Sequence, residues 1–337
     1  MNRRSTGRRV GIKDVARSAG VSVALASLAL NDKPGVSEAT KSRILAVAET
    51  LGYHADPAAR ALRLGRSDIF GLIVRNLQNP FFLDVISGMQ EAALPHGASI
   101  LVMDADYSGA REFDYVAQLA AHRVAGLAIA PVGPGESVAR WRELSPGKPT
   151  VVLNAVCSDA AGIMRVAPDN RQAVRLAIEY LASLGHQRIA FLTAPTDVMA
   201  DHDRLDTYVE LCEQLGLKPM PVATPLALDA TQQVTAALLD SADPPTAVVT
   251  NSDFTVHAVY AAARERGVAV GSQLSVVGHD DLPTSALLDP PLTTLNLDRR
   301  ALGRAVYARL ATDSGLPDHF ESVSLTVRSS TGPVMRR

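Results

Sequence analysis

The sequence predicts a small all-α head followed by a larger α/β body of two doubly wound parallel-sheet subdomains. Residues 1–66 contain 12 Lys and Arg against 5 Asp and Glu, whereas the rest of the chain contains 21 against 30. The basic head shows three short stretches in which apolar residues recur at helical spacing. From residue 69 onward, apolar runs of strand length alternate with helical stretches, which is typical of parallel sheets covered on both faces.

The head begins with two helices separated by a tight turn. The apolar face of the first helix consists of Ile12, Val15, Ala16 and Ala19. Gly20 interrupts this pattern, and Ser22 is a good N-cap for a second helix that we expect to run to about Asn31. The core face of the second helix is expected to consist of Val21, Ala26 and Leu30.

A third helix should brace the first two. Ser37 can cap it, Gly52 ends it, and its expected apolar face consists of Ile44, Leu45, Ala48 and Leu51. This is the helix-turn-helix arrangement. Asp56 and Pro57 then favour a very short helix over 58–63, followed by a linker. We therefore divide the chain into a head over 1–54, a short helix and linker over 55–67, and a body over 68–337.

The body alternates strands and helices. Strands are predicted at 69–74, 100–103, 127–130, 189–192, 247–250 and 275–278. Helices are predicted at 80–96, 111–122, 170–184, 204–215 and 254–266. These units are too many for one compact sheet, so we expect two subdomains with a cleft between them.

Composition excludes several classes of protein. No stretch reaches 18 consecutive apolar residues, so no membrane span is predicted. The two cysteines, Cys157 and Cys212, match neither a disulfide framework nor a close-spaced zinc site, which favours a reducing, cytoplasmic location. The basic start resembles the beginning of a signal peptide, but the charges of Lys13, Asp14 and Arg17 interrupt any apolar segment after it. Secretion is therefore not expected.

Enzymatic motifs are missing from the sequence. It contains no Walker A sequence and no Gly-x-Ser-x-Gly elbow, and Gly133-Pro134-Gly135 lacks the rest of a dinucleotide fingerprint. The runs 201–203 and 279–281 contain His and Asp, but adjacent side chains point apart and rarely bind one metal together. We predict no enzyme activity, no catalytic residues, no metal and no cofactor.

Several motifs carry a family resemblance. In the head these are Ile12-Lys13-Asp14-Val15-Ala16, Ala19-Gly20-Val21-Ser22, Leu30-Asn31 and Leu51-Gly52-Tyr53. In the body they are Asn79-Pro80-Phe81-Phe82, Ser183-Leu184-Gly185-His186, Val276-Val277-Gly278-His279-Asp280-Asp281, Pro291-Leu292-Thr293-Thr294 and Arg328-Ser329-Ser330-Thr331. In this order the motifs cover nearly the whole chain. The sequence therefore resembles the LacI/GalR family of transcriptional regulators.

The resemblance implies a hinge helix after the head and a body like that of periplasmic sugar-binding proteins. The first subdomain would comprise about 68–168 plus 296–318, and the second about 169–295 plus 319–337. Two heads of a homodimer would bind a pseudo-palindromic double-stranded DNA operator. The chain ends near Arg337 without a long heptad tail, which favours a dimer over a coiled-coil tetramer.

The resemblance also implies which head residues contact DNA. The reading positions are the apolar Val23, Ala24 and Leu28, which can at most contact thymine methyl groups. Alternatively, Val23, Leu25 and Leu28 belong to the core. Because the reading positions are apolar, sequence preference would depend more on DNA shape, on backbone amides and on the side chains of Ser22 and Ser27. Asn31 is a further candidate for DNA contact. Candidate phosphate contacts, which could equally be solvated surface charges, are Lys13, Arg17, Lys33 and Lys41.

Leu62 matches the family's hinge leucine. An apolar wedge between base steps kinks DNA from the minor groove, and flanking arginines such as Arg63 meet the negative potential of that groove. So short a helix should form only on DNA beside a partner hinge. The alternative is that Leu62 packs the linker against the body.

The effector would bind between the subdomains. Arg204 matches the family's effector-clamping arginine, although an ion pair with Asp203 or Asp206 is an alternative. Asp253 and Asp280 follow apolar strands, where α/β proteins bind ligands, although Asp253 could simply cap a helix. The remaining candidates are Asn79, Phe81, Phe82 and Leu297. Leu297 stands where the family usually has a polar contact.

Together these features predict a cytoplasmic, sequence-specific transcriptional regulator of the repressor type. Its effector would be a small molecule, with a sugar or sugar derivative as the family default. Two alternatives remain, a solute-binding protein without a DNA role and an α/β enzyme with a DNA-binding appendage. The basic head and the missing export signal argue against the first, and the missing catalytic motifs argue against the second.

Overall fold

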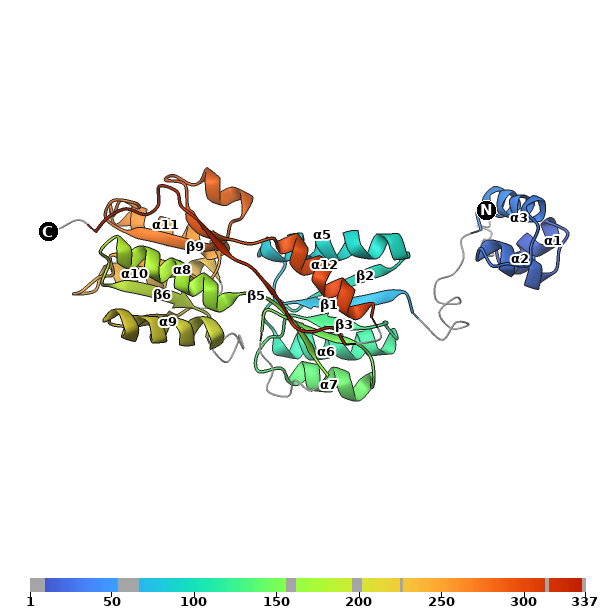
Figure 1. The fold of residues 1–337 in the computed structure, drawn as a ribbon, viewed down its shortest axis with the longest axis horizontal. Coiled ribbons are helices and arrows are strands. Elements are labelled where there is room, and N and C mark those ends of the chain that lie inside the picture. Colours follow the sequence, from blue (N-terminus) through green and yellow to red (C-terminus); the bar gives the residue numbers. More distant parts are fainter. Residues whose placement is uncertain are drawn as a thin grey trace, which may run out of the picture. The chain divides into compact units, whose positions relative to one another are not determined.

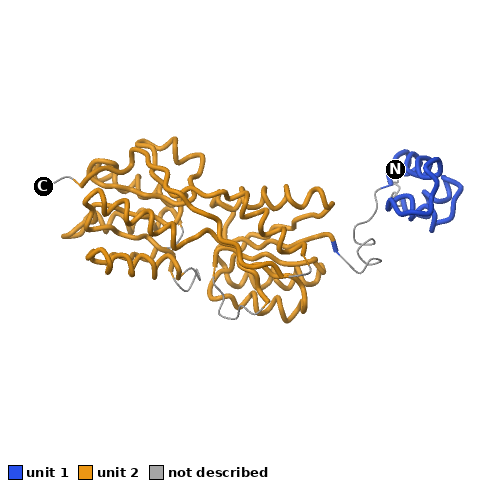
Figure 2. The backbone as a smooth tube through the Cα atoms, viewed as in Figure 1, with its two compact units in different colours: residues 1–67 blue, residues 68–337 orange. Residues whose placement is uncertain are grey.

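The computed structural model describes residues 10–53, 67–155, 162–195, 202–224, 227–312 and 315–334. Two compact units make up the chain, Met1–Ser67 and Asp68–Arg337 (Figure 2). The short helix expected over 58–63, with Leu62 and Arg63, lies outside the described residues.

The head contains the three expected helices, α1 (Ile12–Ser18), α2 (Val23–Leu30) and α3 (Glu38–Thr50). Both predicted N-caps are confirmed. The Leu25 amide donates to Ser22 Oγ at 3.1 Å, and the Thr40 amide donates to Ser37 Oγ at 3.4 Å. These bonds satisfy amides that the helices themselves leave without a partner.

The core of the head is built mainly from small side chains. Its buried members are Val15, Ala16, Ala19, Ala26, Ala29, Ile44 and Ala48. The predicted face of the third helix is wrong at one position, because Leu45 is 44% exposed and Val47 packs against the core instead. Residues 44, 47, 48 and 51 share one face at helical spacing, whereas position 45 lies about 100° away from position 44.

The body contains two six-stranded sheets. The first has the order β11-β5-β4-β3-β1-β2 and is parallel throughout. Its strands are β1 (Ile69–Val74), β2 (Ser99–Asp104), β3 (Leu127–Ile129), β4 (Thr150–Leu153), β5 (Met164–Pro168) and β11 (His319–Glu321). One face is covered by α5 (Phe81–Ala93) and α12 (Arg299–Leu310), and the other by α6 (Gly109–Ala121) and α7 (Glu136–Leu144). The 3₁₀ turn Leu94–His96 follows α5.

The second sheet has the order β12-β10-β9-β8-β6-β7, with only β12 antiparallel to its neighbour. Its strands are β6 (Ile189–Thr193), β7 (Met220–Ala223), β8 (Ala247–Thr250), β9 (Ser275–Asp280), β10 (Thr293–Asn296) and β12 (Ser324–Thr326). The helices α8 (Asn170–Ser183) and α9 (His202–Leu215) cover one face, and α10 (Leu228–Leu239) and α11 (Asp253–Glu265) cover the other. A 3₁₀ turn, Pro283–Leu287, follows β9.

The chain passes between the two sheets three times, after β5, after β10 and after β11 (Figure 1). We expected the last change of subdomain at residue 318. Instead, β11 pairs with β5, His319 opposite Val166, so residues 319–321 belong to the first sheet. The last crossing therefore falls between Glu321 and Ser324.

Two glycines allow α5 and α12 to pack closely. A Cβ on Gly88 would lie 2.1 Å from the Arg300 carbonyl oxygen, and one on Gly303 would lie 2.0 Å from the Val85 carbonyl oxygen. Both distances are far below van der Waals contact and involve backbone atoms. Any larger residue at either position must therefore push the helices apart.

We expect Gly88→Ala to lower the free energy of unfolding by at least about 1–3 kcal/mol, the usual cost of an overpacked core. Urea unfolding of the full chain measures this effect. Gly109→Ala is the matched control, because a Cβ on Gly109, in the first turn of α6, meets nothing within 4 Å. Equal stability of the two variants would contradict the close packing of α5 on α12.

Candidate functional site

The first turn of α2 is open to solvent in the head. Val23 is 43% exposed, Ser22 and Ala24 are exposed, and Leu25 and Leu28 are half-buried. None of these residues belongs to the buried core of the head, so the alternative that Val23 is a core residue is wrong. The C-terminal end of α2 is fixed by Asn31, whose Nδ2 donates to the Ser27 carbonyl oxygen at 2.6 Å.

The candidate phosphate-binding cations of the head differ in exposure and in ion pairing. Lys13, Arg17 and Lys33 are exposed, and Arg17 lies 3.6 Å from Asp14, at the long end of the range for an ion pair. Lys41 is half-buried and pairs with Asp32, and this hydrogen bond lowers the pKa of the Asp32 carboxyl. Lys41 therefore anchors the loop after α2, and the three exposed cations remain the better candidates for phosphate contact.

A narrow cleft in the body brings together most of the predicted effector residues. Its lining consists of Arg75, Asn79, Phe81, Phe82, Tyr107, Asn154, Arg204, Asn251, Ser252 and Asp280. Most follow the carboxyl ends of parallel strands in the two sheets, which is where α/β folds bind ligands. The cavity has a volume of about 40 Å³. It has room for only a few water molecules, so the cleft is nearly closed.

Arg204 is a buried member of this cleft. Its Nε donates to Asn170 Oδ1 at 2.7 Å, and one of its terminal nitrogens donates to the Asn251 carbonyl oxygen at 2.9 Å. The ion-pair alternative is wrong for Asp203, whose carboxylate pairs with Arg165 instead. These contacts fix the plane of the guanidinium at the wall of the cleft, where it can donate a hydrogen bond to a polar ligand.

Five cleft residues were not predicted from the sequence. Arg75 donates to the carbonyl oxygens of Pro131 at 3.0 Å and Asn154 at 2.7 Å. The other four are Tyr107, Asn154, Asn251 and Ser252. Burial raises the pKa of Tyr107 to about 12, so its hydroxyl stays protonated at neutral pH. Arg75, Asn154 and Asn251 could have been predicted, because each is a polar residue directly after a buried strand.

Polar contacts also connect the two sides of the cleft. Asn79, just before α5, has its Nδ2 3.4 Å from Ser252 Oγ, and Ser252 donates to Asp280 Oδ2 at 2.9 Å. Among the described residues, Asn251 Oδ1 is a buried acceptor without a hydrogen-bond partner. It can accept a donor from a ligand, since leaving such an atom unpaired costs free energy.

Two predicted effector residues do not line the cleft. Leu297 is buried in the apolar core. The Asp253 carboxylate turns into the second subdomain, where it accepts hydrogen bonds from the Leu282 amide and the hydroxyls of Ser285 and Thr294. Gly278 leaves room for it, because a Cβ there would lie 2.0 Å from Asp253 Oδ1. Ser252, not Asp253, caps α11.

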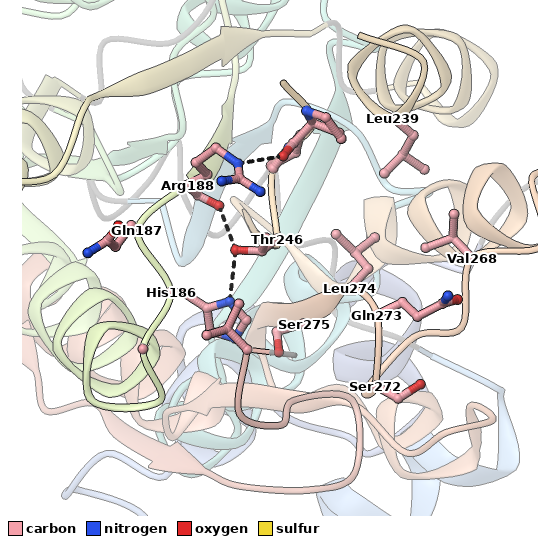
Figure 3. Close-up of a pocket in the computed structure, with 14 residues that line it drawn as sticks. His186, Gln187, Arg188, Leu239, Thr246, Val268, Ser272, Gln273, Leu274 and Ser275 are labelled. Carbon is pink, nitrogen blue, oxygen red and sulfur yellow. Dashed lines mark hydrogen bonds between the residues drawn. The ribbon is translucent and has the colours of Figure 1, made fainter. Parts of the chain in front are cut away.

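A larger cavity of about 460 Å³ lies at the opposite edge of the second sheet, near the first residues of β6, β8 and β9. Figure 3 shows its lining, in which His186 Nδ1 lies 3.0 Å from Thr246 Oγ1 and Arg188 donates to the Pro244 carbonyl oxygen at 2.9 Å. His186 Nε2 lies 3.0 Å from the Gly332 carbonyl oxygen. These polar groups are bonded to one another, so they hold the wall of the cavity together.

Among the described residues, no group of three or more His, Cys, Asp and Glu side chains is placed to hold a metal ion. No helix in the described part of the chain is long and apolar enough to cross a membrane.

The buried Asp253 makes stability depend on pH. Burial, and next the nearby Asp280 charge, raise the pKa of Asp253 from 3.8 to about 7. Between these values the folded protein keeps a proton that the unfolded chain has lost, so the free energy of unfolding should decrease as pH rises. We expect Asp253→Asn to reduce this dependence of the free energy of unfolding on pH, measured by urea unfolding between about pH 4 and pH 7. The exposed control Asp114→Asn should keep it, and an unchanged slope in Asp253→Asn would contradict the assignment.

Comparison with known proteins places these features in a family. Residues 11–56 match "Bacterial regulatory proteins, lacI family", and residues 67–326 match "Periplasmic binding proteins and sugar binding domain of LacI family". The chain is 30% identical to the HTH-type transcriptional repressor CytR of Escherichia coli K12, covering 95% of this chain and 96% of CytR. It is also 30% identical to the ribose operon repressor of Halalkalibacterium halodurans, covering 89% and 88%.

A solved structure agrees with this placement. The lac repressor dimer bound to operator and the anti-inducer ONPF superposes with a TM-score of 0.87 at 27% identity, covering 96% of this chain and all of that one. The predicted fold class and family are thereby confirmed. The chain, with its helix-turn-helix head and its two-sheet body, belongs to the lacI family of bacterial regulatory proteins.

Proposed function

We propose that this chain is a homodimeric transcriptional repressor that binds a pseudo-palindromic operator and responds to a small hydroxylated effector, a sugar or sugar derivative, in the cleft of its body. The main support is that one chain combines a helix-turn-helix, whose second helix has an exposed first turn, with a cleft lined by polar groups from both sheets. The ribose operon repressor and the operator-bound lac repressor dimer are similar over most of this chain.

The chemistry of the cleft supports a hydroxylated ligand. Asn251 Oδ1 and the Asp280 carboxylate are acceptors for ligand hydroxyl groups, and Arg204 is a donor. The rings of Phe81 and Phe82, packed edge to face with centroids 5.2 Å apart, add an apolar wall suited to the C–H face of a sugar ring.

The head supplies the DNA contacts in this proposal. The exposed first turn of α2 would enter the major groove, with Val23 and Ala24 toward the bases, Leu28 beside them and Ser22, Ser27 and Asn31 near the backbone. Lys13 and Arg17 would contact phosphates. Leu62 and Arg63 would act in the minor groove between a head over 1–54 and a body over 68–337.

The effector would act by preferring one of two arrangements of the two subdomains. Because the head is joined to the first subdomain, a change in that arrangement would alter how two heads are held on one operator. The protein would act by binding rather than by catalysis. Since its target is bacterial DNA, we place it in the cytoplasm.

We expect Arg204→Met to weaken effector binding by about 10- to 150-fold, which corresponds to the loss of about 1.5–3 kcal/mol for a hydrogen bond to a charged group. A thermal-shift screen of wild type with D-ribose and cellobiose identifies a ligand, and calorimetry then measures its affinity. The control is Arg171→Met, since Arg171 is an exposed arginine on α8 outside the cleft. An unchanged affinity in Arg204→Met would remove Arg204 from the effector site.

The reading helix gives a separate prediction. Operators selected from random DNA should carry A·T pairs under Val23 and Ala24, because apolar side chains can contact only thymine methyl groups. Ala24→Gln should shift the preference at one base pair toward adenine by about 1–3 kcal/mol, the value of a bidentate contact. Ala46→Gln is the matched control, because Ala46 is an exposed alanine on α3. An unchanged selected sequence in Ala24→Gln would exclude Ala24 as a reading position.

A further inference from the structure

Arg165 on β5 is held by three different contacts. Its backbone N–H donates to Asp318 Oδ1 at 2.8 Å, and its guanidinium carbon lies 5.2 Å from the centroid of the Phe320 ring. One terminal nitrogen donates to the Asp203 carboxylate at 2.7 Å. The backbone bond and the ring contact limit the positions open to the side chain. Less rotamer freedom is therefore lost when the ion pair with Asp203 forms.

This ion pair connects the two subdomains. Arg165 belongs to the first sheet, and Asp203 lies in the first turn of α9, which covers the second sheet (Figure 1). The side chains are only 18% and 26% exposed. By contrast, Arg171 and Glu210 join α8 to α9 within the second subdomain at 3.9 Å, with side chains 59% and 56% exposed. Partial burial and short distance make the Arg165–Asp203 pair the stronger of the two.

Asp203 directly precedes Arg204, the cleft residue on α9. The Asp203 carbonyl oxygen accepts a hydrogen bond from Thr207 Oγ1 at 2.6 Å, and its carboxylate is favourably placed at the positive end of the helix dipole. Asp203 is therefore part of the structure that starts α9. A contact that restrains the Asp203 carboxylate therefore also restrains the backbone of its neighbour Arg204, whose side chain lines the cleft.

We propose that Arg165 is a positioning residue of the effector cleft, which acts through its ion pair with Asp203 to hold the start of α9, and with it Arg204, when the two subdomains are closed. The role of Arg204 in this inference rests on the proposed function. Opening the subdomains separates Arg165 from Asp203, so the pair and a bound effector stabilise the same closed arrangement. Breaking the pair should therefore weaken effector binding, although neither residue lines the cleft.

Hydrogen–deuterium exchange on the full-length, ligand-free protein tests the structural half of this proposal. We expect amides over 207–211 of α9 to exchange about tenfold faster in Arg165→Met, and in Asp203→Asn, than in wild type. The control Arg171→Met removes an exposed arginine that also pairs with α9, and it should leave these rates within about twofold. Arg165→Lys keeps a positive charge opposite Asp203 and should restore most of the protection.

The double variant Arg165→Met/Asp203→Asn decides whether the two residues act as a pair. It should exchange no faster than Asp203→Asn alone, because the ion pair cannot be lost twice. Additive effects, or equal rates in Arg165→Met and Arg171→Met, would overturn the proposal. Thermal unfolding of each variant shows whether faster exchange reflects general destabilisation, in which case amides of α6 would accelerate equally and the proposal would also fail.

Calorimetry tests the link to ligand binding with whichever of D-ribose and cellobiose raises the melting temperature of wild type. Arg165→Met should bind that sugar several-fold more weakly and Arg171→Met normally, while equal affinity in all three would contradict the positioning role. If wild type binds neither sugar, the proposed response to these sugars fails. The exchange experiment still decides whether the ion pair holds α9, since it uses no ligand.

Discussion

The chain passes between the two sheets of the body three times, and the arrangement of both subdomains and of the cleft depends on these passages. Because the chain enters the second sheet after β5, leaves it after β10 and returns after β11, neither subdomain is completed by one continuous segment. The carboxyl ends of parallel strands in both sheets consequently meet at one cleft, and residues more than 200 positions apart line it together. The close packing of α12 on α5 fixes the middle passage to the first sheet.

Buried polar groups restrict which ligands can enter the cleft, because any group left without a hydrogen bond costs free energy. Arg204 and Arg75 are both nearly inaccessible to water, and each is held by neutral oxygen atoms. Asn170 joins these two networks, because its Oδ1 accepts from Arg204 and its Nδ2 donates to Asn154 Oδ1 at 3.2 Å. A ligand that enters must therefore replace hydrogen bonds with others of similar geometry, since an unpaired buried donor or acceptor is expensive.

Periodicity in the sequence predicted the helices of the head and most longer elements of the body. It missed the short strands β4, β5, β7, β10, β11 and β12, because three to five residues give too little alternation to recognise. It also missed α7 and α10, neither of which has a side-chain hydrogen bond at its N-cap, and it missed α12. Five of the predicted effector residues, Asn79, Phe81, Phe82, Arg204 and Asp280, line one cleft in the structure. Asp253 was wrong because its orientation depends on the absent side chain of Gly278, a contact across 25 residues that no local pattern reveals.

The alanine-rich core of the head has a consequence for how the protein behaves away from its operator. Five of its seven buried core residues are alanines, so the helices approach closely but remove little apolar surface from water. A unit of this size with so small a core is only marginally stable by itself. DNA that binds only the folded head adds to its stability in proportion to the logarithm of the free site concentration. The operator is therefore also a folding partner, and the fraction of heads that are folded increases with the fraction that are bound to DNA.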